Sequence, residues 1–153
     1  MSQRVFFFLI LIVGFGTLWG TSQAAATDPI STGLFDNVAV KGYDAVAYFK
    51  AGAPTKGSKD FTHTWQGAEW RFASAAHRDL FVADPEAYAP QFGGYCAWAV
   101  SQGYTAGIDP TAWKIVDGKL YLNYSKNVQA KWEKDVPGHI RAAEGHWPKL
   151  LAE

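Results

Sequence analysis

Residues 61–72 read FTHTWQGAEWRF, and this stretch decides the fold of the chain. Two segments rich in aromatic and β-branched residues flank a Gln-Gly pair, which is the pattern of an antiparallel β-hairpin with a two-residue turn. Pairing across this turn predicts His63 opposite Trp70, and Phe61 opposite Phe72. Because side chains alternate along a strand, these four residues share one face, which we expect to be buried.

A second hairpin is predicted further along the chain. The strands at residues 113–116 and 119–122 are joined by an Asp-Gly turn, which is among the strongest hairpin signals. From Val128 to Leu151, apolar residues recur at helical spacing, with a break at Pro137. The sequence therefore predicts an α+β fold: a small single domain of two β-hairpins packed with short helices and a helical C-terminal tail.

A short helix is expected between the two hairpins, over residues 75–83. Ser74 precedes it and is a good N-cap. The spacing predicts that His77 lies beside the apolar stripe of this helix and is partly buried. That stripe is expected to comprise Ala76, Leu80 and Ala83, with Phe81 at one edge.

Residues 1–26 have the features of a secretory signal peptide. Arg4 supplies a positive start, residues 5–13 form an apolar core, and small residues near the end offer cleavage sites. Glycines within residues 14–20 make the segment a poor membrane-spanning helix. We therefore expect cleavage, a periplasmic or secreted protein, and no membrane span after cleavage.

The rest of the chain is expected to comprise a lead-in segment (27–40) and one domain (41–153). The formal charge of the whole chain is zero, and removal of Arg4 makes it −1, so nucleic acid is not an expected partner. Aromatic residues make up 16% of the chain and seven are tryptophan, enough to build a dense core and also to line a pocket or interface.

Cys96 is the only cysteine of the chain. Exported proteins usually carry cysteines in pairs that form disulfides, whereas a lone cysteine has no partner within its own chain. Two glycines precede Tyr95 and Cys96, and a short helix is expected to follow, which would favour a thiolate. Four roles stay open: a small buried residue, a reactive thiol, a metal ligand, or half of an intermolecular disulfide.

Residues 70–88, WRFASAAHRDLFVADPEAY, resemble the YHS domain. The chain also carries Lys-Gly-Tyr-Asp at residues 41–44, Gly-Gly-Tyr-Cys-Ala at residues 93–97, and the Asp-Gly hairpin, in the order seen in longer exported YHS-domain proteins of bacteria. The resemblance covers about residues 38–150. It implies a metal-binding module whose ligands include cysteines.

The chain departs from the family pattern at the expected ligand positions. Ala47 and Ala73 stand where the resemblance implies cysteines, and His77 replaces a third. The thiolate-rich site of the family therefore cannot be transferred to this chain.

The first functional hypothesis is a periplasmic protein that binds a transition metal for sequestration, delivery or sensing. Its expected ligands are Cys96, His77 and, more weakly, His63, with Asp44 or water as a fourth. Thiolate and imidazole together suit copper, which is the first expectation, and zinc, which is the second. No C-x-x-C or H-x-x-x-H motif supports this set, and His63 also fits a hydrogen-bonded core histidine.

Two alternatives come from other classes of protein. The first is a thiol redox protein in which Cys96 reacts with a partner or an oxidant. Because the chain has no second cysteine, this protein would need an external thiol. Tyr95, Trp98 and Tyr104 would define a non-catalytic envelope module that binds another envelope protein or a small molecule through its aromatic surface. The sequence offers no convincing catalytic constellation, because it lacks a G-x-S-x-G motif and Ser74 is expected to serve as an N-cap.

Overall fold

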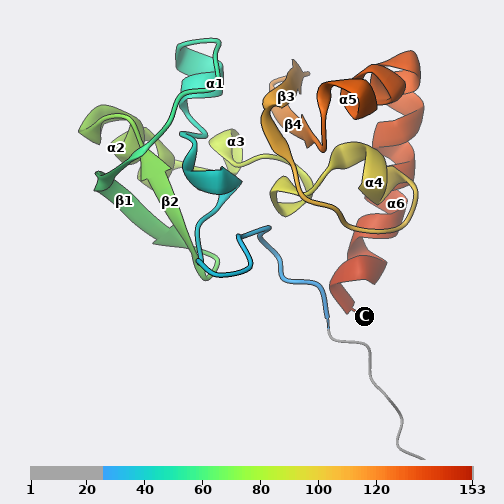
Figure 1. The fold of residues 1–153 in the computed structure, drawn as a ribbon, viewed down its shortest axis with the longest axis horizontal. Coiled ribbons are helices and arrows are strands. Elements are labelled where there is room, and N and C mark those ends of the chain that lie inside the picture. The colour runs from blue at the N-terminus through green and yellow to red at the C-terminus, as the bar shows by residue number, and fades with distance from the viewer. Residues whose placement is uncertain (1–25, 153) are drawn as a thin grey trace, which may run out of the picture.

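The computed structural model describes residues 26–152, so the predicted signal peptide, apart from its last residue, lies outside the described residues. Two antiparallel two-stranded sheets are packed with short helices and a C-terminal helix, which confirms the predicted α+β class (Figure 1). The elements in chain order are η1 (Val40–Gly42), α1 (Ala47–Lys50), β1 (Ser58–Trp65), β2 (Ala68–Phe72), α2 (Ala75–Ala83), α3 (Pro85–Tyr88), η2 (Phe92–Gly94), α4 (Ala97–Ser101), β3 (Asp109–Val116), β4 (Lys119–Asn123), α5 (Lys126–Trp132), η3 (Glu133–Asp135) and α6 (Val136–Ala152).

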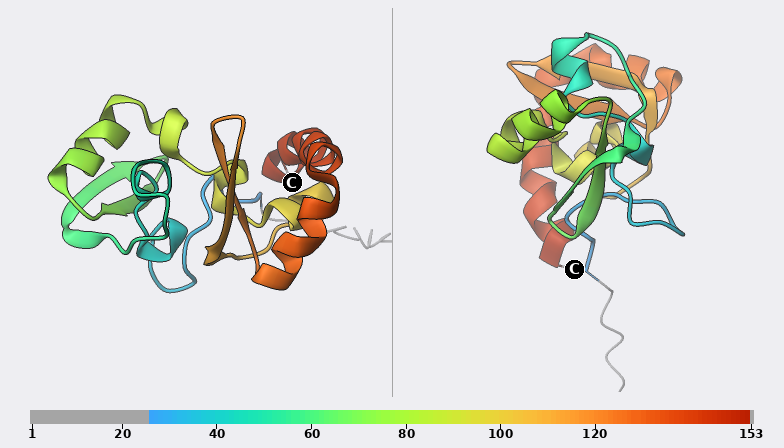
Figure 2. Two further views of the ribbon diagram at one scale, coloured as in Figure 1. Left: turned by 90° about the horizontal axis from the view of Figure 1, so that it is seen from above. Right: turned by 90° about the vertical axis from the view of Figure 1, so that its left-hand side faces the viewer.

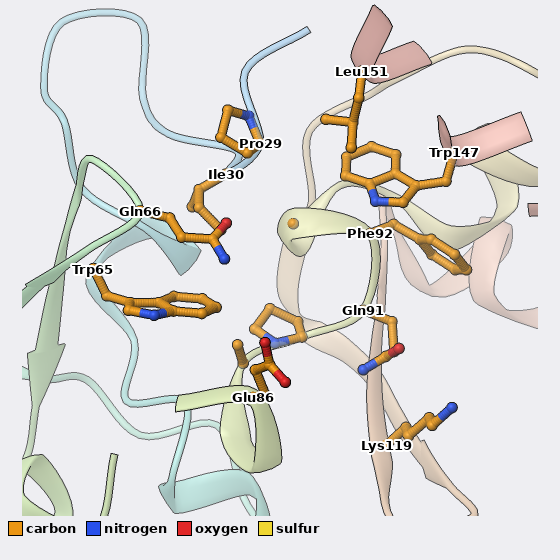
Figure 3. Close-up of a pocket in the computed structure, with 13 residues that line it drawn as sticks. Pro29, Ile30, Trp65, Gln66, Glu86, Gln91, Phe92, Lys119, Trp147 and Leu151 are labelled. Atoms are coloured by element: carbon orange, nitrogen blue, oxygen red, sulfur yellow. The ribbon is translucent and has the colours of Figure 1, made fainter. Parts of the chain in front are cut away.

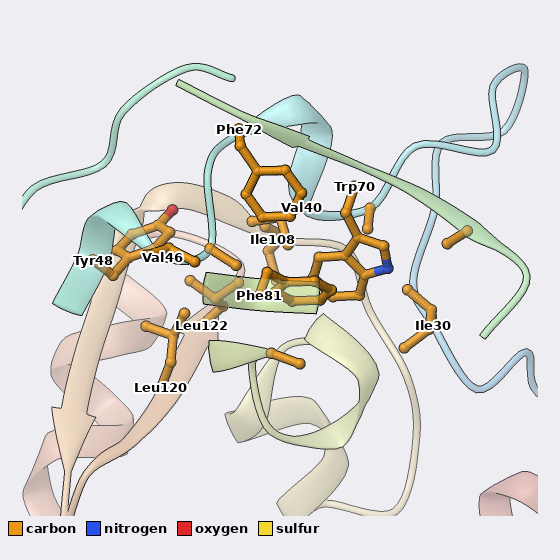
Figure 4. Close-up of a cluster of buried hydrophobic side chains, with 14 of the residues drawn as sticks. Ile30, Val40, Val46, Tyr48, Trp70, Phe72, Phe81, Ile108, Leu120 and Leu122 are labelled. Atoms are coloured by element: carbon orange, nitrogen blue, oxygen red, sulfur yellow. The ribbon is translucent and has the colours of Figure 1, made fainter. Parts of the chain in front are cut away.

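The β3–β4 hairpin stands in the middle of the molecule, with β1, β2 and α2 on one side and α4, α5 and α6 on the other (Figure 2). Side chains alternate along β4, so its two faces join two different hydrophobic clusters. Leu120 and Leu122 belong to the cluster on the β1–β2 side (Figure 4). Tyr121 belongs to the cluster under α4 and α6. The domain therefore consists of two halves that share one hairpin.

The first hairpin pairs as predicted near its turn but not at its far end. His63 lies opposite Trp70, whereas Phe72 pairs with Ser58 and not with Phe61. The prediction for Phe61 was wrong because a bulge separates Ser58 from Thr62. Hydrogen bonds between the Ser58 hydroxyl and Asp60 form a local turn at this bulge.

Helix α2 begins where it was predicted but presents a different face to the core. The Ser74 hydroxyl accepts a hydrogen bond from the His77 backbone N–H, as an N-cap does. Phe81 is fully buried and His77 is half-buried, whereas Leu80 and the two alanines of the predicted stripe are exposed. The predicted stripe was wrong because contacts of His77 and Phe81 with other elements set the rotation of the helix.

The lead-in segment packs onto the domain. Ile30 and Val38 are buried, and the Ser31 N–H donates a hydrogen bond of 2.8 Å to the Gly93 carbonyl oxygen. A Cβ at residue 93 would collide with the carbonyl group of Pro29, and the φ of Gly93 is +61°. Glycine is therefore required at residue 93 for the segment to lie against η2.

Tyr48 links the two halves of the domain. Its ring is buried and packs edge-on against Trp113 of β3, with 5.2 Å between ring centroids. Its hydroxyl donates a hydrogen bond of 2.8 Å to the Pro110 carbonyl oxygen, and burial raises the pKa of Tyr48.

The C-terminal tail is helical as predicted, with Pro137 in the first turn of α6. Within residues 26–152, no helix has the length and apolarity required to cross a membrane.

Candidate functional site

The Asp44 carboxylate and the His77 imidazole form a hydrogen-bonded pair. The Asp44 side chain is fully buried, and one of its oxygens accepts hydrogen bonds from the backbone N–H groups of Val46 and Ala47, at 2.8 and 3.1 Å. The other oxygen accepts from the Ala73 N–H at 2.9 Å and lies 2.6 Å from the His77 Nδ1. Asp44 thus joins the turn before α1 to the start of α2.

This pairing fixes the His77 imidazole. A carboxylate that accepts four hydrogen bonds places the proton of the ring on Nδ1, so Nε2 is the nitrogen free to bind something else. The His77 side chain is 22% exposed, whereas Asp44 is completely buried. Histidines that bind metals commonly donate their second ring N–H to a carboxylate in this way.

Cys96 lies in a different environment, before the first turn of α4 and at 1% exposure. Its sulfur accepts a hydrogen bond from the Tyr124 N–H at 3.3 Å and lies 3.7 Å from the Asn123 Oδ1, which can accept the thiol hydrogen. The same amide oxygen accepts the Trp98 N–H at 3.2 Å, so Asn123 caps α4 in place of Cys96.

The three predicted metal ligands do not form one cluster. His77 is bonded to Asp44, Cys96 to residues 123 and 124, and the His63 ring packs edge-on near Phe81 with 6.3 Å between centroids. In the described part of the chain, no group of three or more His, Cys, Asp or Glu side chains is arranged to hold a metal ion. The residues present therefore do not fit a mononuclear Cys/His/His site, which needs three or four ligands at fixed distances.

The structure does bring Cys96 together with two of the predicted aromatic residues. Cys96, Trp98 and Tyr104 line a largely apolar pocket of about 220 Å³, which we call the Cys96 pocket, and Tyr124 stands at its edge. The Trp98 and Tyr104 rings meet edge-on at 6.4 Å. Tyr95, the third predicted aromatic residue, does not line this pocket and packs against Trp147 of α6.

A larger cleft of about 520 Å³ lies between the two halves of the domain (Figure 3). We call it the inter-hairpin cleft, because the turn of the first hairpin borders one side and Lys119 of β4 and helix α6 border the other. It is lined by residues 29–30, 65–66, 86 and 89–93, together with Lys119, Trp147 and Leu151. Clefts of this size between packed units are common positions for ligand sites.

Two tryptophans stand on opposite sides of the inter-hairpin cleft (Figure 3). Trp65 is held from behind by Trp70 and Phe81, with ring centroids 5.7 and 5.8 Å away. Trp147 is held by Phe92 and Tyr95, with centroids 6.1 and 5.9 Å away. Each indole is therefore fixed by two further aromatic rings before any ligand arrives.

Polar side chains also line the cleft. Gln66 lies beside Trp65, Glu86 and Gln91 lie below the two indoles in this view, and the amine of Lys119 points away from the rings (Figure 3). Gln66 and Phe92 have φ values of +48° and +56°, in the left-handed region that residues other than glycine seldom adopt. For Gln66 this conformation is the one that the two-residue hairpin turn with Gly67 (φ +77°) requires.

Comparisons of the chain with protein-family models, with curated proteins and with solved structures find no match. The resemblance to the YHS domain therefore stays a prediction from the sequence.

The sequence analysis did not single out the residues of the inter-hairpin cleft. Gln66 and Phe92 carried a weak signal, because each directly precedes a glycine, and Gln66 occupies a turn position where Asn, Asp or Gly is usual. Trp65 and Trp147 carried none beyond the high tryptophan content, because only the packing of the two halves brings them to one cleft.

Proposed function

We propose that the protein is a non-catalytic binding module that takes its ligand in the inter-hairpin cleft. The observation that carries this proposal is the pair of indoles, Trp65 and Trp147, each fixed by two aromatic rings and facing one cleft that also holds amide and carboxylate groups. A rigid site of this kind loses little conformational entropy when a ligand binds.

The lining of the cleft supports binding rather than turnover. Among the described residues that line it, Glu86 is the only carboxylate, and no cysteine, serine, threonine or histidine is present. Nucleophilic and general acid–base mechanisms need such groups in pairs. Lys119 is the one other ionisable residue among the described lining residues, and no hydrogen bond or salt bridge joins it to Glu86. The proposal thus belongs to the interaction-module class, with its site in a different place from the predicted aromatic surface.

A thermal-shift screen of the mature protein with a diverse small-molecule set tests this proposal. A ligand present at 100 times its dissociation constant stabilises the folded protein by about 2.7 kcal/mol, which raises the melting temperature by about 5–10 °C in a domain of this size. We expect compounds that raise it in the wild type and in Trp98→Ala but not in Trp147→Ala. Both positions are half-buried tryptophans, but only Trp147 lines the cleft. Stabilising compounds that act equally on all three proteins, or a screen without any, would contradict the proposal.

Metal binding through His77 is the second candidate, and the Asp44–His77 hydrogen bond is the observation that favours it. We expect one imidazole ligand to give weak copper binding, with external ligands completing the coordination. Mass spectrometry of the protein purified from the periplasm measures the bound copper.

The matched variants for this measurement are His77→Asn, whose amide can still donate to Asp44, and Cys96→Ala. If the protein holds one copper ion per chain and each substitution abolishes it, both His77 and Cys96 are ligands, as the sequence predicted. That result would conflict with the different hydrogen-bond partners of His77 and Cys96 described above.

A further inference from the structure

We infer that the ligand of the inter-hairpin cleft is a neutral oligosaccharide, an inference that rests on the function proposed above. Sugar rings have apolar C–H faces that stack on indoles and hydroxyl groups that both donate and accept hydrogen bonds. The cleft has an indole on each of two sides, and amide and carboxylate groups are among the other residues that line it.

The indoles supply the stacking surfaces. Trp65 is backed by Trp70 and Phe81, so the ring stays in place while its remaining surface borders the cleft (Figure 3). Trp147 does the same from α6, on the opposite side. Two stacking surfaces separated by a cleft of about 520 Å³ fit a di- or trisaccharide better than a single sugar ring.

The polar groups match hydroxyls. Gln66 and Gln91 each carry an amide that donates through its nitrogen and accepts through its oxygen, and the Glu86 carboxylate accepts. Hydroxyl groups can satisfy all of these atoms without carrying charge. Each amide belongs to a short connecting segment held by the fold, Gln66 in the β1–β2 turn and Gln91 just before η2.

The charges of the cleft favour a neutral ligand. Glu86 and Lys119 carry one charge of each sign, and no other charged side chain is among the described residues that line it. A strongly anionic or cationic ligand would therefore meet no matching field. Hydrolysis of a bound glycan needs two carboxyl groups about the scissile bond, and the cleft supplies one, so the sugar is held and not cleaved.

Isothermal titration of the mature protein with cellotriose, chitotriose and maltotriose tests the inference. We expect at least one of the three to bind, with an affinity that does not change between low and high salt because the ligand is uncharged. Trp147→Ala and Gln91→Ala should each weaken this binding by about tenfold or more. Trp98→Ala, which lies outside the cleft, should change it by less than about twofold.

No heat of binding with any of the three sugars, or binding that survives both cleft substitutions, would overturn the inference. Circular dichroism spectra of the variants show whether they are folded. If Trp147→Ala does not fold, Gln91→Ala alone tests the cleft. If the sugars fail while the thermal-shift screen finds compounds that depend on Trp147, the saccharide class is wrong and the proposed function stands. If both experiments fail, both are wrong.

Discussion

Replacing Asp44 by alanine is expected to lower the free energy of unfolding by about 3–5 kcal/mol, measured by urea denaturation. The substitution leaves three backbone N–H groups and the His77 ring N–H without their acceptor. Buried donors without partners lose the hydrogen bonds that water provides in the unfolded state, which makes this loss larger than that of one ordinary hydrogen bond.

Asp79→Ala is the matched control for this substitution. The Asp79 carboxylate is exposed and bonds only to the neighbouring Arg78, so its removal should change the free energy of unfolding by less than about 0.5 kcal/mol. A double-mutant cycle with His77→Ala should give a coupling energy of about 1–3 kcal/mol. A loss below about 1 kcal/mol in Asp44→Ala would show that this carboxylate does not hold α2 to the turn before α1.

Replacing Phe81 by alanine is expected to cost about 3–5 kcal/mol of unfolding free energy. The ring is fully buried and packs against Trp70 and Phe72, with centroids 4.8 and 5.1 Å away, and against Trp65. Its removal leaves a cavity among rigid aromatic rings that cannot collapse to fill it. The substitution also removes one of the two rings that support Trp65, so ligand binding in the cleft should weaken as well.

Leu80→Ala is the matched control, because the two residues are neighbours on one helix. Leu80 is 38% exposed, so its truncation should cost less than about 1 kcal/mol. The sequence pattern placed Leu80 within the apolar stripe of the helix and Phe81 only at its edge. Equal costs for the two substitutions would mean that α2 is rotated from the orientation described here.

The local elements of this fold were predictable because short stretches of sequence contain their determinants. The two turns, Gln66-Gly67 and Asp117-Gly118, fixed both hairpins, and Ser74 fixed the start of α2. Each of these depends on the conformational preference of one or two residues.

The failures concern features that depend on contacts between distant segments. The rotation of α2 follows from the pairing of His77 with Asp44 and the packing of Phe81 against residues of β2, and no helical periodicity contains that information. The bulge in β1 follows from hydrogen bonds of Ser58 with Asp60 that compete with the strand ladder. The predicted ligands His77 and Cys96 belong to separate polar clusters, because the capping roles of Asp44 and Asn123 tie them to different helices.

The inter-hairpin cleft shows the same limit most clearly. Its walls come from the lead-in segment, both hairpins, η2 and α6, which meet only when the two halves pack about β3–β4. Of the residues predicted to bind a ligand, Tyr95 takes part indirectly, as one of the rings behind Trp147, while Trp98 and Tyr104 line the separate Cys96 pocket.

The most direct test of the binding site is the ¹H–¹⁵N spectrum of the tryptophan indoles, recorded during titration of the protein with a compound from the thermal-shift screen or with a trisaccharide. The indole signals of Trp65 and Trp147 are expected to shift together along one binding curve, because both rings border the cleft. The signal of Trp132, which is fully buried under α4 and α6, should stay in place. Shifts confined to Trp98, beside Cys96, with Trp65 and Trp147 unchanged, would contradict the account and move the site to the Cys96 pocket.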